Sequence, residues 1–133
     1  MKIRPAHPSE AALIKELIYE LALFEKAPES AQATIEQISG AFFAERPAVF
    51  CDLIEDDQGI VVGLAIWFLN YSTWTGTHGI YLEDLFIRPE ARGKGYGKAV
   101  LAHLATNVWN VVITDCNGGF WIGTKRRSSS IKA

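Results

Sequence analysis

Apolar residues in the first part of the chain recur at intervals of three and four positions. This spacing predicts a helix with one buried face, formed by Leu13, Ile14, Leu17, Ile18, Leu21 and Phe24. The HPSE segment before it suits a helix start, because Pro8 fits the first turn and Glu10 favours the positive helix end. Pro28 is expected to end the helix. A short strand at 1–4 comes before it, and a second helix at 34–43 follows it.

Strand patterns occupy the middle of the chain. Residues 49–54 and 60–69 are two apolar runs joined by the turn sequence DDQG, which predicts a hairpin. Residues 71–78 are expected to form a polar loop, and 79–87 a further core strand. A helix is expected at 98–105. The alternation of helices and strands predicts one α/β (α+β) domain.

Length and composition are those of a single ordinary globular domain. The chain has 133 residues, of which 49% are hydrophobic and 21% charged. A net charge of -2 argues against nucleic acid or an anionic membrane surface as a partner. No apolar run is long enough to cross a bilayer, and the N-terminal MKIRPAHPSE lacks the apolar segment of a signal peptide. We therefore expect a cytoplasmic protein.

Cysteines and histidines do not suggest a metal site. Cys51 and Cys116 are isolated, with neither metal-ligand spacing nor a disulfide framework. His7, His78 and His103 do not cluster along the sequence. No metal is therefore expected.

The most informative segment is 80–98, IYLEDLFIRPEARGKGYGK, in which a strand runs through a glycine-rich loop into a helix. Glycines let backbone N–H groups converge on an anion, and the helix N-terminus adds positive potential at the same place. This combination suits a pyrophosphate group. The P-loop pattern is absent, and a Rossmann fingerprint would need glycine at Lys98. The alternative is a tight strand-to-helix connection that binds no ligand.

The pattern Arg92-x-x-Gly95-x-Gly97 resembles the R/Q-x-x-G-x-G/A motif with which GNAT acetyltransferases hold the pyrophosphate of acetyl-CoA. The longer segment YLEDLFIRPEARGKGYG is similar to that of spermidine/spermine acetyltransferases and their bacterial relatives. The similarity extends to IRPA, LALFEKAPE and VVGLAIWFLNYSTWTG, and covers residues 1–105. It implies the GNAT fold, with a mixed, mainly antiparallel sheet flanked by helices, in a domain at 1–106.

The resemblance implies acetyl-CoA as cosubstrate and assigns its contacts. Backbone groups of the strand around Phe86, those of Leu85 and Ile87, would pair with the pantetheine arm as an added strand does. The amide near Leu85 would also polarise the thioester carbonyl. Arg92 and the backbone amides of the loop would hold the pyrophosphate, namely those of Gly93, Lys94, Gly95, Tyr96, Gly97 and Lys98.

The resemblance also assigns an acidic amine site. Glu83 matches the glutamate thought to deprotonate the substrate amine through water, and Asp84, Glu25 and Trp74 match positions that line a polyamine site. The chemistry needs such groups, because an alkyl amine with a pKa near ~10 arrives as an ammonium ion that cannot attack a thioester. Alternatives stay open. Adjacent strand residues point to opposite faces, so in the alternative interpretation at least one of Glu83 and Asp84 is a solvated surface charge. In that interpretation Glu25 is a solvent-exposed charge at a helix end, and Trp74 only caps the core.

The implied function is N-acetylation of a primary amine on a small polyamine, diamine or lysine-like substrate. A homodimer is a further expectation, since relatives are commonly dimers. Two alternatives remain: a GNAT-like module that binds CoA without turnover, and a structural remnant without a ligand.

The resemblance ends after Ala105. Such enzymes continue with a strand and a segment of the form WxVLDWNxxAIxFYxxLGA, which supplies a pantetheine-contacting asparagine and a tyrosine thought to protonate the leaving thiolate. Here the chain reads TNVWNVVITDCNGGFWIGTKRRSSSIKA. Its 108–114 stretch is still strand-prone because it is rich in β-branched residues. We therefore expect the C-terminal strand–helix unit to be missing or altered, and 107–133 to be aberrant or divergent.

We hypothesise that a one-nucleotide shift of the reading frame produced this tail. When the codons of 116–133 are read one nucleotide back, the permitted residues include LQWWVLDWNKAAIEFYKS. Leucine is forced at the position of Cys116, and aspartate at that of Ile122. The alternative is a native, divergent and basic end of the chain.

We predict that the gene contains this hidden frame. Restoring it should raise acetyl-transfer turnover at least ~10²-fold, because a well-placed general acid contributes that much. The nucleotide sequence of the region, followed by a rate comparison of the two chains, is the measurement. Unrelated residues or an early stop in the shifted frame would show that the tail is native.

Overall fold

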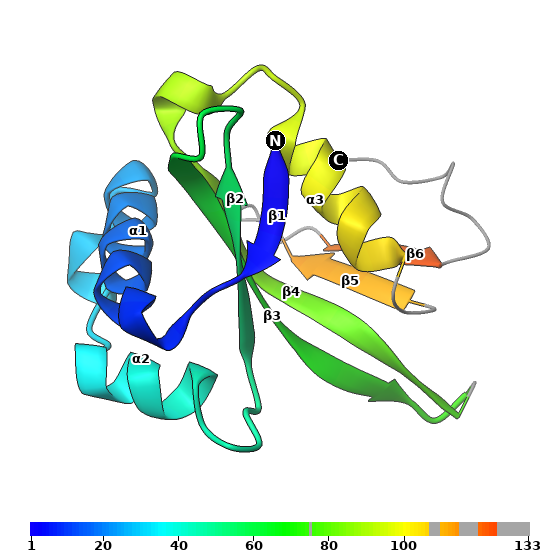
Figure 1. Ribbon diagram of the computed structural model, residues 1–133. Coiled ribbons are helices and arrows are strands. Elements are labelled where there is room, and N and C mark those ends of the chain that lie inside the picture. Colours follow the sequence, from blue (N-terminus) through cyan, green and yellow to red (C-terminus); the bar gives the residue numbers. More distant parts are fainter. Residues whose placement is uncertain (75, 107–109, 115–119, 125–133) are drawn as a thin grey trace.

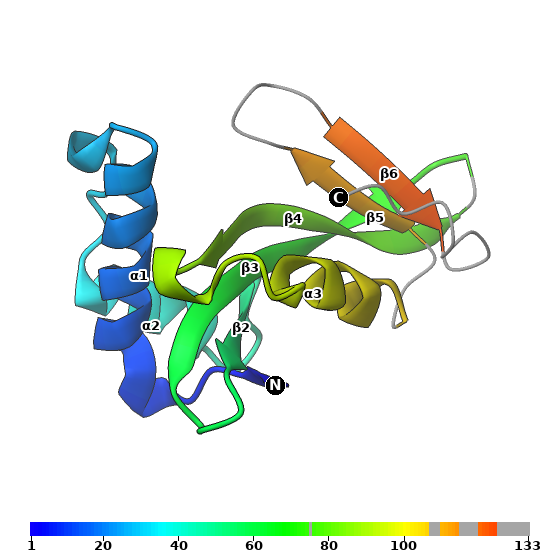
Figure 2. The same ribbon diagram turned by 90° about the horizontal axis from the view of Figure 1, so that it is seen from above.

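The computed structural model describes residues 1–74, 76–106, 110–114 and 120–124, which form one sheet with helices on both faces (Figures 1 and 2). The strands and helices are β1 (Lys2–Pro5), α1 (Ala11–Phe24), α2 (Ile35–Phe42), β2 (Phe50–Glu55), β3 (Val61–Ser72), β4 (Thr77–Ile87), α3 (Tyr96–Ala105), β5 (Asn110–Thr114) and β6 (Phe120–Thr124). Short 3-10 turns are η1 (Pro8–Glu10), η2 (Pro28–Ser30) and η3 (Pro89–Ala91).

The six strands lie side by side in chain order. All neighbours are antiparallel except β4 and β5, which run parallel. A parallel pair needs a crossover connection, and α3 supplies it. The predicted mixed, mainly antiparallel sheet with flanking helices is therefore confirmed.

Two hydrophobic cores lie on opposite faces of the sheet. On one face α1 and α2 cover apolar residues of β2, β3 and β4, with Ile14, Leu17, Leu53 and Leu64 fully buried. On the other face α3 covers Ile54, Ile80 and Leu82. Figure 2 shows α1 and α3 separated by the sheet. This layering follows from the strand alternation, because Leu53 and Ile54 are neighbours that face different helices.

The pairing of β4 with β5 is short. It covers Ile80–Leu82 against Val111–Ile113. Beyond Leu82, residues Asp84 to Ile87 of β4 stay paired with β3 but extend past the described pairing with β5. The chain then turns through η3 into α3 at the same end of the sheet. The second half of β4 thus has an edge not covered by the described part of β5.

The hairpin between β3 and β4 is longer than predicted. The expected loop at 71–78 is strand except for the turn after Ser72, because aromatic cross-strand pairs extend the ladder. The rings of Phe68 and Tyr81 stack with centroids 4.8 Å apart, and those of Tyr71 and His78 meet edge to face at 5.1 Å. The hairpin projects away from the helices in both views (Figures 1 and 2).

Residues beyond α3 add two strands to the sheet. The strand tendency predicted for 108–114 is realised as β5, whereas β6 had no counterpart in the sequence-based prediction. The serine-rich basic tail, 125–133, lies outside the described residues. The division of the chain at residue 106 stays a prediction.

Helix α1 ends before Pro28, where the sequence pattern had placed its end. The backbone N–H of Ala27 donates to the carbonyl of Ala22 at 2.8 Å, and that of Lys26 donates to Leu23 at 3.0 Å. This reversal is the Schellman arrangement, and it requires a left-handed residue just past the helix. Lys26 takes that conformation, with φ of 60°, although glycine is the residue best suited to it.

We predict that Lys26→Gly stabilises the protein by up to ~1 kcal/mol, because glycine adopts the left-handed conformation without steric strain. Chemical denaturation is the measurement. Lys26→Ala is the matched control, since it removes the same exposed side chain but keeps Cβ, and it should bring no gain. Equal effects of both variants would contradict the prediction.

Candidate active site

Beyond Leu82, the edge of β4 opposite β3 is open among the described residues, and it presents backbone groups of Leu85 and Ile87. The N–H of Arg88 donates to the carbonyl of Val62 in β3 at 2.8 Å. Backbone groups of successive strand residues alternate between the two sides, so those of Leu85 and Ile87 face away from β3. In agreement, the carbonyl of Ile87 accepts a bond from the Arg92 side chain instead of from β3.

The glycine-rich loop adjoins this edge and leads into α3. Gly93 and Gly95 have φ of 80° and 78°, the left-handed region in which residues with a Cβ are strained. A Cβ placed at either glycine would meet no atom within 4 Å, so the space beside the loop is open. Gly95 is the N-cap of α3 and makes no side-chain capping bond. The first-turn amides of α3 therefore form a positive, uncapped helix end.

The residues that follow Gly95 belong to the first turn of α3. The helix begins at Tyr96, two residues earlier than the predicted start at Lys98. Tyr96 is half-buried against the α3 core, and a Cβ on Gly97 would lie 3.9 Å from the Leu85 side chain. Lys94 and Lys98 are exposed. Two lysines and an uncapped helix end make the loop suitable for an anion.

Arg92 lies between the loop and the end of α1. Its Nε donates to the carbonyl of Ile87 at 2.8 Å. Its guanidinium carbon lies 4.2 Å from the ring centroid of Phe24 and 5.5 Å from that of Phe86. Arg92, the predicted pyrophosphate ligand, thus also contacts the end of α1. Helical periodicity had identified Phe24 only as a residue of the buried face and did not predict this contact.

The acidic pair on β4 coincides with a β-bulge. Ile66 pairs with Asp84 and Trp67 with Leu82, so Glu83 is an extra residue without a partner in β3. Before the bulge Leu82 packs on the α3 face, and after it Leu85 does. The premise that adjacent strand residues face opposite ways therefore does not hold here, because a bulge interrupts the alternation. Glu83 is exposed, whereas Asp84 is half-buried.

Burial, together with the negative charges of Glu83 and Glu25, raises the pKa of Asp84 to about 6. Glu25 is the C-cap of α1. Carboxylates from two separate elements are therefore close enough to interact electrostatically. A carboxyl group with this pKa is still mostly ionised at neutral pH and accepts protons better than an ordinary aspartate.

Two predicted site residues lie elsewhere. The Phe86 side chain is only 3% exposed, in the core beneath α1, and by the same strand alternation its backbone groups face β3. Trp74 is 97% exposed in the turn of the long hairpin. Both views place that turn at the far end of the molecule from α1, which carries Glu25 (Figures 1 and 2). The structure thus does not bring Trp74 together with the acidic residues, and the roles assigned to Phe86 and Trp74 stay predictions.

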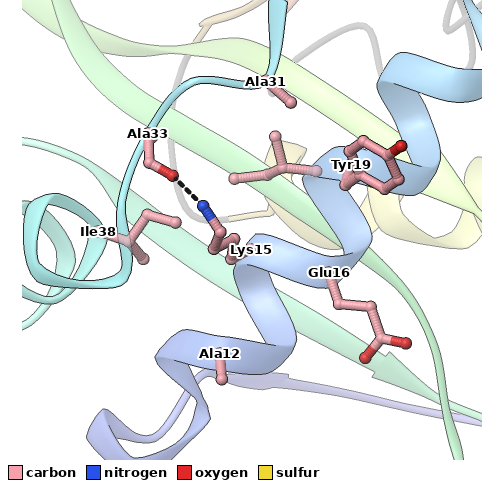
Figure 3. A pocket seen from close by; sticks show the side chains of 8 residues that line it. Ala12, Lys15, Glu16, Tyr19, Ala31, Ala33 and Ile38 are labelled. Atoms are coloured by element: carbon pink, nitrogen blue, oxygen red, sulfur yellow. Dashed lines mark hydrogen bonds between the residues drawn. The ribbon is translucent and has the colours of Figure 1, made fainter. Parts of the chain in front are cut away.

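A separate groove of about 470 Å³ lies on the outer side of α1 (Figure 3). Lys15 crosses it and donates to the carbonyl of Ala33 at 2.8 Å. None of the predicted site residues lines it. The groove therefore belongs to the packing of α1 on the α2 connection and not to the candidate site.

The described ranges show neither a metal site nor a membrane-spanning helix. They contain no group of three or more His, Cys, Asp or Glu side chains arranged to hold a metal ion. Among the helices that the structure describes, none has the length and apolar character needed to cross a membrane.

Comparison with known proteins points to acetyltransferases. The chain is 35% identical to a thialysine N-epsilon-acetyltransferase of Mus musculus, over 78% of this chain and 65% of that protein. It is 30% identical to a human spermidine/spermine N(1)-acetyltransferase-like protein 1, over 87% of this chain and 17% of that one. The chain thus spans slightly less than two thirds of the mouse relative.

Solved structures agree on the fold. An aminoglycoside acetyltransferase from an uncultured soil metagenomic sample superposes with a TM-score of 0.68 at 16% identity, covering 86% of this chain and 80% of that one. A family model described as the acetyltransferase (GNAT) family matches residues 14–111, well over half of the sequence. The chain therefore belongs to the GNAT acetyltransferase family.

Proposed function

We propose that the protein transfers an acetyl group from acetyl-CoA to a primary amine of a small polyamine, diamine or lysine-like substrate. The observation that carries this proposal is the open edge of β4 leading into a glycine loop, with half-buried Asp84 on the same strand. Family membership supports the reaction class. The relatives' names, which specify thialysine and spermidine or spermine, support a substrate with more than one cationic group.

The residues of the open edge and loop fit acetyl-CoA. The outward-facing backbone groups of Leu85 and Ile87 match an amide-bearing pantetheine arm, which can pair as a short strand does. The empty space beside Gly93 and Gly95 admits a pyrophosphate close to the backbone. The uncapped N-terminus of α3 supplies N–H donors and positive potential for it.

The acidic residues fit an amine that must be deprotonated. Glu83, through water, or Asp84 accepts a proton from the ammonium group, so that the nitrogen lone pair can attack the thioester carbonyl. The carbonyl oxygen becomes negative as the C–N bond forms, and the amide near Leu85 stabilises it. The carbonyl then re-forms as the C–S bond breaks, and the second proton lost by the attacking nitrogen passes through water to the leaving thiolate, which gives the amide and free CoA. Glu25 adds negative charge that attracts a cationic substrate.

A module that binds CoA without turnover is the second candidate. It is favoured by one observation, namely that the asparagine–tyrosine segment expected from the resemblance does not occur in the sequence. Without that tyrosine, water would have to protonate the leaving thiolate. A cytoplasmic location and a homodimer belong to the first proposal as further expectations.

We predict that acetyl-CoA raises the melting temperature and that NAD does not. Gly95→Val should remove the acetyl-CoA shift, because the new side chain would fill the open space at the loop. Differential scanning fluorimetry with each ligand is the measurement.

Gly76→Val is the matched control for backbone strain. Gly76 also has a left-handed φ, 68°, but lies in the turn of the long hairpin. This variant should lose stability and keep the acetyl-CoA shift. An equal shift with NAD, or a full shift in Gly95→Val, would count against the cofactor.

We predict a division of roles between the two carboxylates that pH profiles will show. Glu83→Gln and Asp84→Asn should both lower kcat/KM, by ~10²-fold for whichever residue is the base. For the base, the loss should shrink at high pH, where the amine is already neutral. In the unmodified chain kcat/KM should fall below about pH 6 as Asp84 becomes protonated. Losses that do not vary with pH would show that neither residue is the base.

Thermal stability provides an internal control for the second variant. Between the ordinary aspartate pKa of 3.8 and about 6, the native state binds more protons at Asp84 than the unfolded state does. Stability contributed at this site therefore falls as pH rises through that window. The free energy of unfolding of Asp84→Asn minus that of the unmodified chain should consequently be larger above pH 6 than at pH 4. The activity loss then cannot be attributed to unfolding.

A further inference from the structure

The end of α1 is attached to the segment after β4 at two points, one helical turn apart. Arg88 forms an ion pair with Glu20, with Nη2 at 2.9 Å from Oε2. Four residues later in each element, the guanidinium of Arg92 lies 4.2 Å from the ring centroid of Phe24. The two contacts together align the last turn of α1 with the chain leading into the glycine loop.

The second contact involves an aromatic ring with little burial of its own. Phe24 is 58% exposed, so packing into the core does not hold it in place. Arg92 is itself held by its Nε bond to the carbonyl of Ile87 at 2.8 Å. A guanidinium group that stacks on an aromatic face and donates along its edge has a defined orientation, which a flexible ammonium group lacks. The ring is therefore anchored to the end of β4.

The residue after Phe24 is the acidic C-cap of α1. Glu25 donates its backbone N–H to the carbonyl of Leu21 at 3.0 Å, and the left-handed Lys26 turns the chain away directly after it. The position of Glu25 is thus determined by the last turn of α1. Its charge acts on Asp84, which also interacts with Glu83 on its own strand and with the Cys51 thiol of β2.

We propose that Phe24 is a positioning residue for the amine site: stacked under Arg92, it fixes the last turn of α1 so that Glu25 stays within electrostatic reach of Asp84 and close to the cofactor loop. The inference rests on the proposed function. Phe24 touches no substrate in this account, and it acts through Glu25. Without the ring, the last turn of α1 loses its attachment to Arg92, and Glu25 moves away from Asp84. The open edge of β4 and the loop amides keep their geometry.

The test is the amine kinetics of Phe24→Ala with a diamine and acetyl-CoA. We expect KM for the diamine to rise roughly fivefold, the size of effect when one nearby carboxylate is displaced, with kcat changed less than about twofold. The acid limb of the kcat/KM profile should shift to lower pH, because Asp84 loses a like-charged neighbour. The acetyl-CoA melting shift should be retained.

Two variants separate positioning from folding. Phe24→Tyr keeps the aromatic face and should restore both KM and the acid limb. Phe24→Leu keeps an apolar side chain without that face and should behave like Phe24→Ala while remaining folded. Leu23→Ala is the matched control, since Leu23 is also exposed, at 49%, in the same turn, and it should have native kinetics.

The outcomes distinguish this inference from the function on which it rests. A native KM and an unmoved acid limb in Phe24→Ala would overturn the role of Phe24 and leave the proposed function intact. Equal losses in Phe24→Ala and Leu23→Ala would also overturn it, because they would indicate general packing of the helix end. Failure of the unmodified chain to acetylate any amine would instead overturn the proposed function, and the inference with it.

Discussion

Backbone hydrogen bonding of β4 is the constraint on which the rest of the structure depends. One side of this strand is paired with β3 on both sides of the bulge at Glu83, and within the described residues the other side is paired with β5 over Ile80–Leu82. Polar backbone groups at an uncovered edge need partners, and a ligand with amide groups can supply them. The glycine loop and α3 follow directly from that edge, so the strand and the anion site share one segment of chain.

The segment formed by β4 and the glycine loop carries opposite charges at its two ends. Arg92, Lys94 and the uncapped start of α3 make the loop end positive, whereas Glu83 and Asp84 make the bulge negative. An anionic cosubstrate and a cationic amine would thus be drawn to neighbouring positions by opposite fields. Arg92 lies at the boundary, and its contact with Phe24 connects the loop to the helix that carries Glu25.

Predictions from the sequence were most accurate where local patterns decide structure. The glycines of the loop, the period of α1 and the hairpin turn each follow from a few neighbouring residues, and all three appear in the structure. They were less accurate where distant contacts decide. The hairpin extends through 71–78 because rings from two strands pair.

The sequence by itself determined the family, the order of elements as far as α3 and the glycine loop, because these depend on residue types at fixed short spacings. Only the tertiary structure decided the geometry of the acidic residues. Alternation along an ideal strand would separate Glu83 from Asp84, but register with β3 leaves one residue too many, and a bulge results. The pKa of Asp84 likewise depends on burial and on Glu25 of a distant helix. Such effects arise from the packing of elements far apart in the chain, which local sequence does not encode.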